Sequence, residues 1–133
     1  MKAWLDEATF FPAQRVYAHV RILIDEGLQS LRGTTRRGLL PLRIRIEGRP
    51  PLIAEALELP SGRPFRVEGL AETFSVVEGT VNMKVPFYFS DEVTEDATVT
   101  VWMAYQACTE SVCLVPEQLR IDLPIGYLPI PRP

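Results

Sequence analysis

Apolar and polar residues alternate with a period of two over five separate stretches of the chain. Such alternation is typical of strands that bury one face, so each stretch predicts a half-buried strand whose apolar side faces a common core. The stretches are 15–24, 42–47, 83–89, 98–105 and 119–125. The core is expected to be lined by Val20, Ile22, Ile44, Val85, Phe87, Val101, Met103 and Ile121.

Turn-forming residues separate these stretches, at 25–27, 33–38, 48–51, 60–62 and 90–96. Short strands joined by turns indicate two packed sheets, so we predict an all-β fold, an immunoglobulin-like β-sandwich formed as one domain by residues 1–128. Residues 129–133 are expected to form a proline-rich tail or linker. Residues 52–59 carry a faint helical pattern. Pro86 lies inside a strand pattern, which predicts an edge strand or a bulge.

The composition narrows the class of protein. A chain of 133 residues can bury a core without help from disulfides or metals. Its net charge of −3 argues against nucleic-acid binding, which normally requires a basic face. No apolar run approaches the ~18 residues of a membrane helix, and residues 1–7 lack the apolar segment and cleavage site of a signal peptide. We therefore expect either a cytosolic protein or a mature or trimmed chain.

Few residues could support other kinds of chemistry. One histidine and two cysteines do not supply the four ligands of a structural zinc site without carboxylates, so no metal is expected. His19 lies among charged and polar neighbours on its strand, which indicates a solvated surface residue rather than a general base. Residues 33–38 could contact an anion, but a basic hairpin loop is the preferred interpretation. The carboxylates are scattered and predict no hydrolase site.

Cys108 and Cys113 lie in the connection between two predicted strands, with four residues between them. Four residues can turn between adjacent strands, so the two Cα atoms are expected within the roughly 4.4–6.8 Å that a disulfide permits. Closing so short a ring stabilises a fold by only about 2 kcal/mol, which a domain of this size does not need. The spacing leaves a structural disulfide, two buried thiols and a redox-active pair open.

The segment from Tyr105 to Glu117, YQACTESVCLVPE, resembles the cysteine motif of the amino-terminal periplasmic domain of the DsbD thiol:disulfide interchange proteins. In that family a strand ends in Tyr-Gln-x-Cys, a second cysteine follows within a few residues, and prolines and often a glutamate come next. The resemblance covers residues 70–125. Within it, Glu72-Thr73-Phe74 falls where the family carries an acidic-x-Phe cap loop, and residues 82–89 resemble a strand with a central Val-Pro.

Two departures from the family pattern concern the wall of the site. Gly27-Leu28-Gln29 stands where relatives often carry aromatic residues and a histidine, and it has neither. A single proline, Pro116, follows the second cysteine where many relatives have two. The aromatic wall of the family's site is therefore not predicted for this chain.

The resemblance implies an immunoglobulin-like sandwich and an electron relay that uses no metal, flavin or nucleotide cofactor. It implies that Cys113 forms the mixed disulfide with partners and that Cys108 resolves it. Phe74 would act as a lid over the sulfurs, the alternative being plain core packing. Glu72 and Glu110 would add negative charge that disfavours the thiolate. The remaining residues of the site wall would be Tyr105, Gln106 and Pro116.

We therefore expect a periplasmic or otherwise extracytoplasmic thiol:disulfide oxidoreductase domain that relays electrons through Cys108 and Cys113. By resemblance it is reduced by a thioredoxin-like partner that a transmembrane electron-transfer domain feeds, and it then reduces other thioredoxin-like proteins. The alternative is an immunoglobulin-like binding module, able to dock a membrane partner, whose disulfide is purely structural. The reduction potential separates the two, because structural disulfides lie below about −300 mV.

Overall fold

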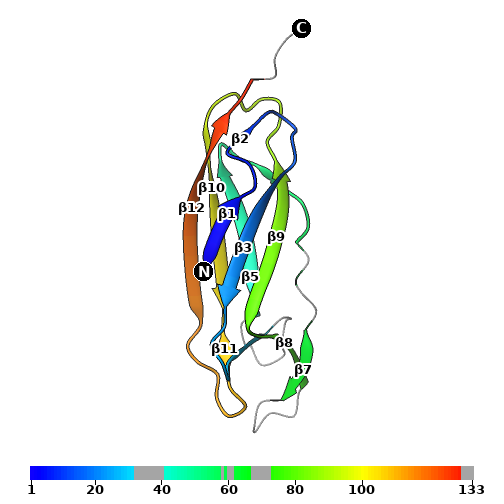
Figure 1. The fold of residues 1–133 in the computed structure, drawn as a ribbon, viewed down its shortest axis with the longest axis vertical. Helices are drawn as coiled ribbons and strands as arrows, with labels where there is room; N and C mark the ends of the chain where they lie inside the picture. Colours follow the sequence, from blue (N-terminus) through cyan, green and yellow to red (C-terminus); the bar gives the residue numbers. More distant parts are fainter. Residues whose placement is uncertain (32–40, 58, 60–61, 67–72, 130–133) are drawn as a thin grey trace.

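A computed structural model describes residues 1–31, 41–57, 59, 62–66 and 73–129. Two four-stranded sheets pack face to face in it, and a smaller third sheet lies at one end (Figure 1). The first sheet contains, in spatial order, β1 (Lys2–Leu5), β3 (Val16–Leu23), β9 (Thr80–Tyr88) and β6 (Ile53–Ala54). The second contains β2 (Thr9–Phe10), β12 (Glu117–Tyr127), β10 (Ala97–Tyr105) and β5 (Arg43–Arg49). The third contains β11 (Ala107–Cys108), β4 (Gln29–Leu31), β8 (Thr73–Val77) and β7 (Arg63–Arg66).

The pairing of the long strands follows from the alternation in the sequence. In β3 buried residues alternate with more exposed ones along all eight positions, as expected when one face of a strand is turned to a core. β3 pairs antiparallel with β9, and β10 pairs antiparallel with β12 on one side and β5 on the other. Only β2 and β12 run parallel among the named pairs. The described chain is thus all-β, as predicted, with the two long sheets forming an immunoglobulin-like sandwich.

Six of the eight residues predicted to line the core are buried, namely Val20, Ile22, Val85, Phe87, Val101 and Met103. The other two, Ile44 and Ile121, are half-buried. Ile44 lies on β5 at the edge of its sheet, and Ile121 lies on β12 where β2 does not reach, so each has a strand on one side only. Phe10 and Phe89, with ring centroids 4.4 Å apart, are fully buried members of the same core.

The faint helical pattern over residues 52–59 corresponds to no helix in the part of this segment that the structure describes. Ile53 and Ala54 instead form β6, which pairs with Tyr88 and Phe87 of β9. The stretch is too short to stabilise an isolated helix, and pairing satisfies backbone groups at the end of β9.

Pro86 stands where the pairing between β6 and β9 ends. Its carbonyl oxygen accepts the Glu55 N–H at 2.8 Å on the side of β6. Because the amide nitrogen and carbonyl of a strand residue face the same side, the missing N–H of Pro86 removes no ladder bond from the β3 side. Pro86 is therefore tolerated in β9, which has β3 along one side and β6 on the other side only at Phe87 and Tyr88.

Strands of the sandwich continue into the third sheet. β3 leads into β4 through a turn at Asp25–Leu28, where Gly27 has a φ of 84° that favours glycine. β8 leads into β9 through Gly79, with a φ of 70°. β10 leads into β11 through Gln106. In Figure 1, β11, β8 and β7 therefore lie at the end of the sandwich opposite the carboxyl terminus.

Across the described ranges, no helix has the length and apolar character needed to cross a bilayer.

Candidate functional site

The two cysteines face each other across a short hairpin that extends from the sandwich. Cys108 of β11 forms an antiparallel bridge with Cys113. Two backbone hydrogen bonds flank this bridge, from Leu114 N to Ala107 O at 2.8 Å and from Thr109 N to Val112 O at 2.7 Å. This arrangement is that of a non-hydrogen-bonded pair, the position in an antiparallel ladder where opposite residues approach most closely.

The side chain of Thr109 closes the loop of this hairpin. Its Oγ1 donates a hydrogen bond to Val112 O and accepts from the backbone N–H groups of Ser111 and Val112, at 3.1–3.2 Å. Serine and threonine hydroxyls commonly satisfy turn amides in this way. The loop that joins the two cysteines is thereby held in a defined conformation by its own residues.

Cys108 and Cys113 form a disulfide, so the expectation that they lie close enough to bond is confirmed. Their Cα atoms are 4.0 Å apart, which is shorter than the predicted range. The distance falls just below the lower end of that range because the two residues are directly opposed in an antiparallel bridge. Directly opposed residues at a non-hydrogen-bonded site have Cα atoms only about 4.5 Å apart before any bond joins the side chains.

The two half-cystines differ in exposure. Cys108 is 0% exposed, whereas Cys113 is half-buried. Three apolar side chains next to Cys113 in sequence extend into solvent, those of Val112, Leu114 and Val115, with Val115 83% exposed. We call these three residues the apolar collar. Cys113 is thus the more exposed half of the disulfide.

Tyr105 and Glu117 form the last pair of the ladder between β10 and β12, at the base of the cysteine hairpin. The Tyr105 hydroxyl donates to Oε2 of Glu117 at 2.6 Å. This hydrogen bond to the carboxylate, together with partial burial, raises the pKa of Tyr105 to about 12. The hydrogen bond between Tyr105 and Glu117 thus stabilises the last pair of the ladder, where the hairpin begins.

The other two wall residues predicted after the strand are also placed beside the hairpin. Gln106 donates from Nε2 to the carbonyl oxygen of Leu114 at 3.0 Å, which ties the incoming strand to the outgoing one. Pro116 is exposed and directly precedes the Tyr105–Glu117 pair. Glu110 lies at the exposed tip of the loop.

The predicted cap residues are only partly within the described structure. Glu72 lies outside the described residues. The backbone of Phe74 belongs to β8 and pairs with Phe65 of β7, but its side chain falls outside what is described. β8 pairs with β4, and β4 pairs with β11, so the backbone of Thr73 and Phe74 belongs to the same small sheet as Cys108. The lid therefore stays a prediction.

Two residues beside the cysteines were missed by the sequence reasoning. Gln29 of β4 pairs with Cys108, and its Nε2 donates to Oε2 of Glu78 at 3.3 Å. In the sequence, Gln29 stands out only as a departure from the aromatic residues of the family pattern. The signal that could have found it is its place in a stretch where relatives carry side chains of the site.

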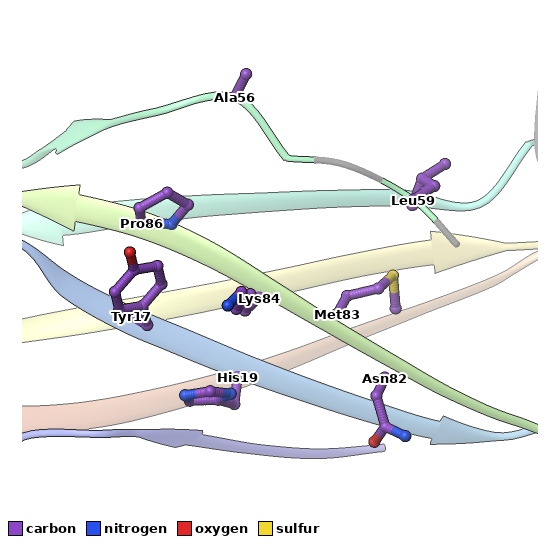
Figure 2. A pocket seen from close by; sticks show the side chains of 8 residues that line it. All are labelled: Tyr17, His19, Ala56, Leu59, Asn82, Met83, Lys84 and Pro86. Carbon is purple, nitrogen blue, oxygen red and sulfur yellow. The ribbon is translucent and has the colours of Figure 1, made fainter. Parts of the chain in front are cut away.

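An open hollow of about 570 Å³ lies elsewhere, on the outer face of β3 and β9. Figure 2 shows Tyr17, His19 and Lys84 on this face, with Ala56 and Leu59 on the segment beside it. His19 stacks on Trp4 with ring centroids 5.3 Å apart and is half-buried on this outer face, where a surface residue was predicted. The hollow holds neither cysteine. The basic segment 33–38 lies outside the described residues.

Comparison with known proteins identifies the family of this chain. A family model described as "Thiol:disulfide interchange protein DsbD, N-terminal" matches residues 33–125. The crystal structure of the reduced amino-terminal domain of DsbD from Neisseria meningitidis is similar in fold, with a TM-score of 0.53 and 18% sequence identity over 84% of this chain and 77% of that chain. No curated protein matches the chain in sequence. Because the family model spans well over half of the residues and includes both cysteines, this chain belongs to the family of DsbD amino-terminal domains.

Proposed function

We propose that this chain is an extracytoplasmic thiol–disulfide exchange domain that passes electrons between thioredoxin-like partners. The observation that carries the proposal is the unequal exposure of the two halves of one disulfide, with Cys108 fully buried and Cys113 half-buried. An attacking thiolate needs access to the sulfur that it attacks. Cys113 is therefore the residue that forms the mixed disulfide, and Cys108 is the resolving residue.

Reduction of the domain takes two displacements. A partner thiolate attacks Sγ of Cys113, a bond forms between these sulfurs, and the Cys108–Cys113 bond breaks. Sγ of Cys108 leaves with the electron pair and takes up a proton. The second thiolate of the partner then attacks the partner's own sulfur in the mixed disulfide and releases Cys113, which also takes up a proton. The partner loses two electrons and two protons, and the domain gains them.

Passing the electrons on is the same sequence in reverse. The thiolate of Cys113 attacks a sulfur of an oxidised thioredoxin-like protein, and the thiolate of Cys108 then attacks Sγ of Cys113 in the mixed disulfide. The second protein leaves as a dithiol, and the domain returns to its disulfide. No metal or organic cofactor takes part in either direction.

The apolar collar supports a protein partner rather than a small thiol. Val112, Leu114 and Val115 are exposed on both sides of Cys113 in sequence. Exposed apolar side chains gathered at one place are typical of surfaces that bind other proteins. An extracytoplasmic location is supported by the disulfide itself, because disulfides persist in oxidising compartments.

A trapping experiment tests the function. In a Cys108→Ser variant, the Cys113 thiol should attack a thioredoxin whose single remaining active-site cysteine is activated as a mixed disulfide with nitrothiobenzoate. The products are a stable protein–protein disulfide and free nitrothiobenzoate, measured by its absorbance. The matched Cys113→Ser variant retains only the buried Cys108 and should react at least tenfold more slowly. Equal rates for the two variants, or no reaction with Cys108→Ser, would contradict the proposal.

The lid is part of the same proposal. We expect Phe74, with Glu72 beside it, to shield the sulfurs until a partner docks, because a dithiol in an oxidising compartment must be protected from stray disulfides. Phe74→Ala should then speed alkylation of the reduced protein by iodoacetamide and change exchange with thioredoxin less. Its cost in stability should be below the ~3–5 kcal/mol of a buried core phenylalanine. If the alkylation rate is unchanged and the free energy of unfolding falls by about 3–5 kcal/mol, Phe74 is a core residue and not a lid.

A further inference from the structure

Four side chains form a row across the third sheet and its hairpin. Gln29 of β4 is the Cα partner of Cys108 in β11, and Cys108 bridges Cys113 on its other side. Directly opposed residues of antiparallel strands place their side chains on the same face, with Cβ atoms about 4.5–5.5 Å apart. Cys108 therefore lies between Cys113 and Gln29. Glu78 extends the row beyond Gln29, to which it is hydrogen-bonded.

The hydrogen bond to Glu78 sets the orientation of the Gln29 amide. Nε2 of Gln29 donates to Oε2 of Glu78 at 3.3 Å. An ionised carboxylate only accepts hydrogen bonds, so the NH₂ group must face Glu78 and the amide oxygen must face away from it. Gln29 is only 8% exposed, and within the described part of the chain its Oε1 is buried without a hydrogen-bond partner.

A buried acceptor without a donor destabilises the state in which it occurs. In the disulfide form the neighbouring sulfur of Cys108 carries no hydrogen, so it cannot donate to this oxygen. Reduction changes that sulfur. When the disulfide takes up two electrons and two protons from a partner dithiol, one of the protons ends on Sγ of Cys108, which then becomes a donor.

We propose that Gln29 is a positioning residue whose side-chain oxygen accepts a hydrogen bond from the Cys108 thiol in the reduced domain. The inference rests on the proposed exchange function, since it concerns the reduced state that this function requires. The hydrogen bond exists only after reduction, so it stabilises the dithiol relative to the disulfide. The hydrogen bond breaks when Cys108 loses its proton to attack a mixed disulfide at Cys113, the more exposed of the two sulfur-bearing residues.

The test replaces Gln29 by methionine, which keeps the length of the side chain but removes the amide. Oxidised and reduced fractions are measured by alkylation and mass spectrometry in mixtures of glutathione and glutathione disulfide. Gln29→Met should lower the equilibrium constant for reduction about tenfold, equivalent to a potential about 30 mV more negative. The matched control is Ser30→Ala, which removes the hydroxyl of the adjacent buried residue on the other face of β4 and should change the constant less than twofold.

A second measurement needs no substitution at Gln29. In a Cys113→Ala variant the one thiol present is that of Cys108, and its S–H stretching band in the infrared should lie at the lower frequency of a hydrogen-bonded thiol. A band at the position of a free thiol would overturn the proposal whether or not Gln29→Met folds.

The possible failures are distinguishable. A wild-type disulfide that glutathione does not reduce at all would contradict the exchange function. A wild-type disulfide that is reduced, with an equilibrium constant within twofold of that of Gln29→Met, would contradict the role of Gln29 and leave the exchange function standing.

Discussion

The sandwich and the small sheet at its end are built differently from the same chain. In the sandwich, β10 pairs with β12 over nine residues, and the buried side chains of both sheets form one apolar core. In the end sheet, β4 pairs with β11 and with β8 over two residues each. Two of the three buried side-chain atoms that lack a hydrogen-bond partner in the described structure, Gln29 Oε1 and Ser30 Oγ, belong to β4.

The difference indicates how stability and reactivity are divided. The long ladders and the core hold the fold, so the end sheet can carry features that would weaken a core: a breakable bond, an unsatisfied amide and an exposed apolar collar. Changes in the sandwich should therefore affect the free energy of unfolding, and changes in the end sheet should affect thiol chemistry. The four predictions below test this division.

The largest effect on stability is expected from Phe87→Ala. Phe87 is fully buried in β9 and packs edge to face against Phe89, with centroids 6.0 Å apart. Removing a buried phenylalanine ring costs about 3–5 kcal/mol, which urea unfolding would measure. The reduction potential should stay within a few millivolts of wild type. A large shift in the reduction potential would show that the core and the cysteines are coupled. That result would contradict the division between the sandwich and the end sheet.

Reduction of the disulfide should lower the free energy of unfolding by about 2 kcal/mol, because the ring that the disulfide closes is short. This effect is smaller than that of Phe87→Ala. Urea unfolding of the oxidised and the dithiothreitol-reduced protein measures the difference. Hydrogen exchange should locate it: amides of β4 and β11 should exchange faster after reduction, and those of β10 should not. Loss of protection throughout β10 would mean that the disulfide supports the whole fold and would favour a structural disulfide.

Tyr105→Phe tests the boundary between the two regions and should cost about 0.5–1 kcal/mol, since the lost hydrogen bond is partly solvated. The pKa of Tyr105 in the folded protein, about 12, lies above its ordinary value near 10. The stabilisation is therefore fully present below about pH 10 and is lost as the pH rises through about 12.

Spectrophotometric titration and unfolding at high pH check this prediction. Tyr105→Phe should lack the late phenol transition and the associated loss of stability. Glu117→Gln keeps an acceptor but removes the charge, so it should move the Tyr105 transition to lower pH. A transition that Glu117→Gln leaves unchanged would show that the carboxylate is not its cause.

The smallest effect on stability, within about 0.5 kcal/mol, is expected from Val115→Ser, because this side chain is 83% exposed. The rate at which Cys108→Ser forms its disulfide with activated thioredoxin should nevertheless fall several-fold when Val115→Ser is added. Leu128→Ser removes an exposed apolar side chain at the carboxyl-terminal end of β12 and is the matched control, with no change in rate. Equal rates of disulfide formation for Val115→Ser and Leu128→Ser would show that the apolar collar is not part of the docking surface.

How far the sequence predicts the structure also differs between the two regions. Five strands of the sandwich, β3, β5, β9, β10 and β12, are long enough to show a period of two, so these strands and most of the core residues could be predicted. β4 and β11 are too short for any period, and Val76 and Val77 of β8 are buried one after the other. A pattern cannot reveal strands whose consecutive residues are both buried.

Within the candidate site, the cysteines were found because a motif is a local pattern. Gln29 comes close to Cys108 only through pairing between strands that are far apart in sequence, and no hydrophobic period near residue 29 indicates that register. The same limit explains why the faint helical pattern over residues 52–59 does not reveal β6: Ile53 and Ala54 pair with β9, which the local sequence does not encode.

The hairpin geometry also bears on how fast the domain can turn over. Its two backbone hydrogen bonds, Leu114–Ala107 and Thr109–Val112, and the contacts of Thr109 do not involve the sulfurs, so they can persist when the disulfide opens. Cys108 and Cys113 then remain neighbours, and the attack of one on a mixed disulfide at the other is an intramolecular reaction between groups already in place. Well-oriented reactions of this kind reach effective molarities of about 10⁵ M or more. A captured partner should therefore be released almost as soon as it is bound, and the intermediate should accumulate only when Cys108 is absent.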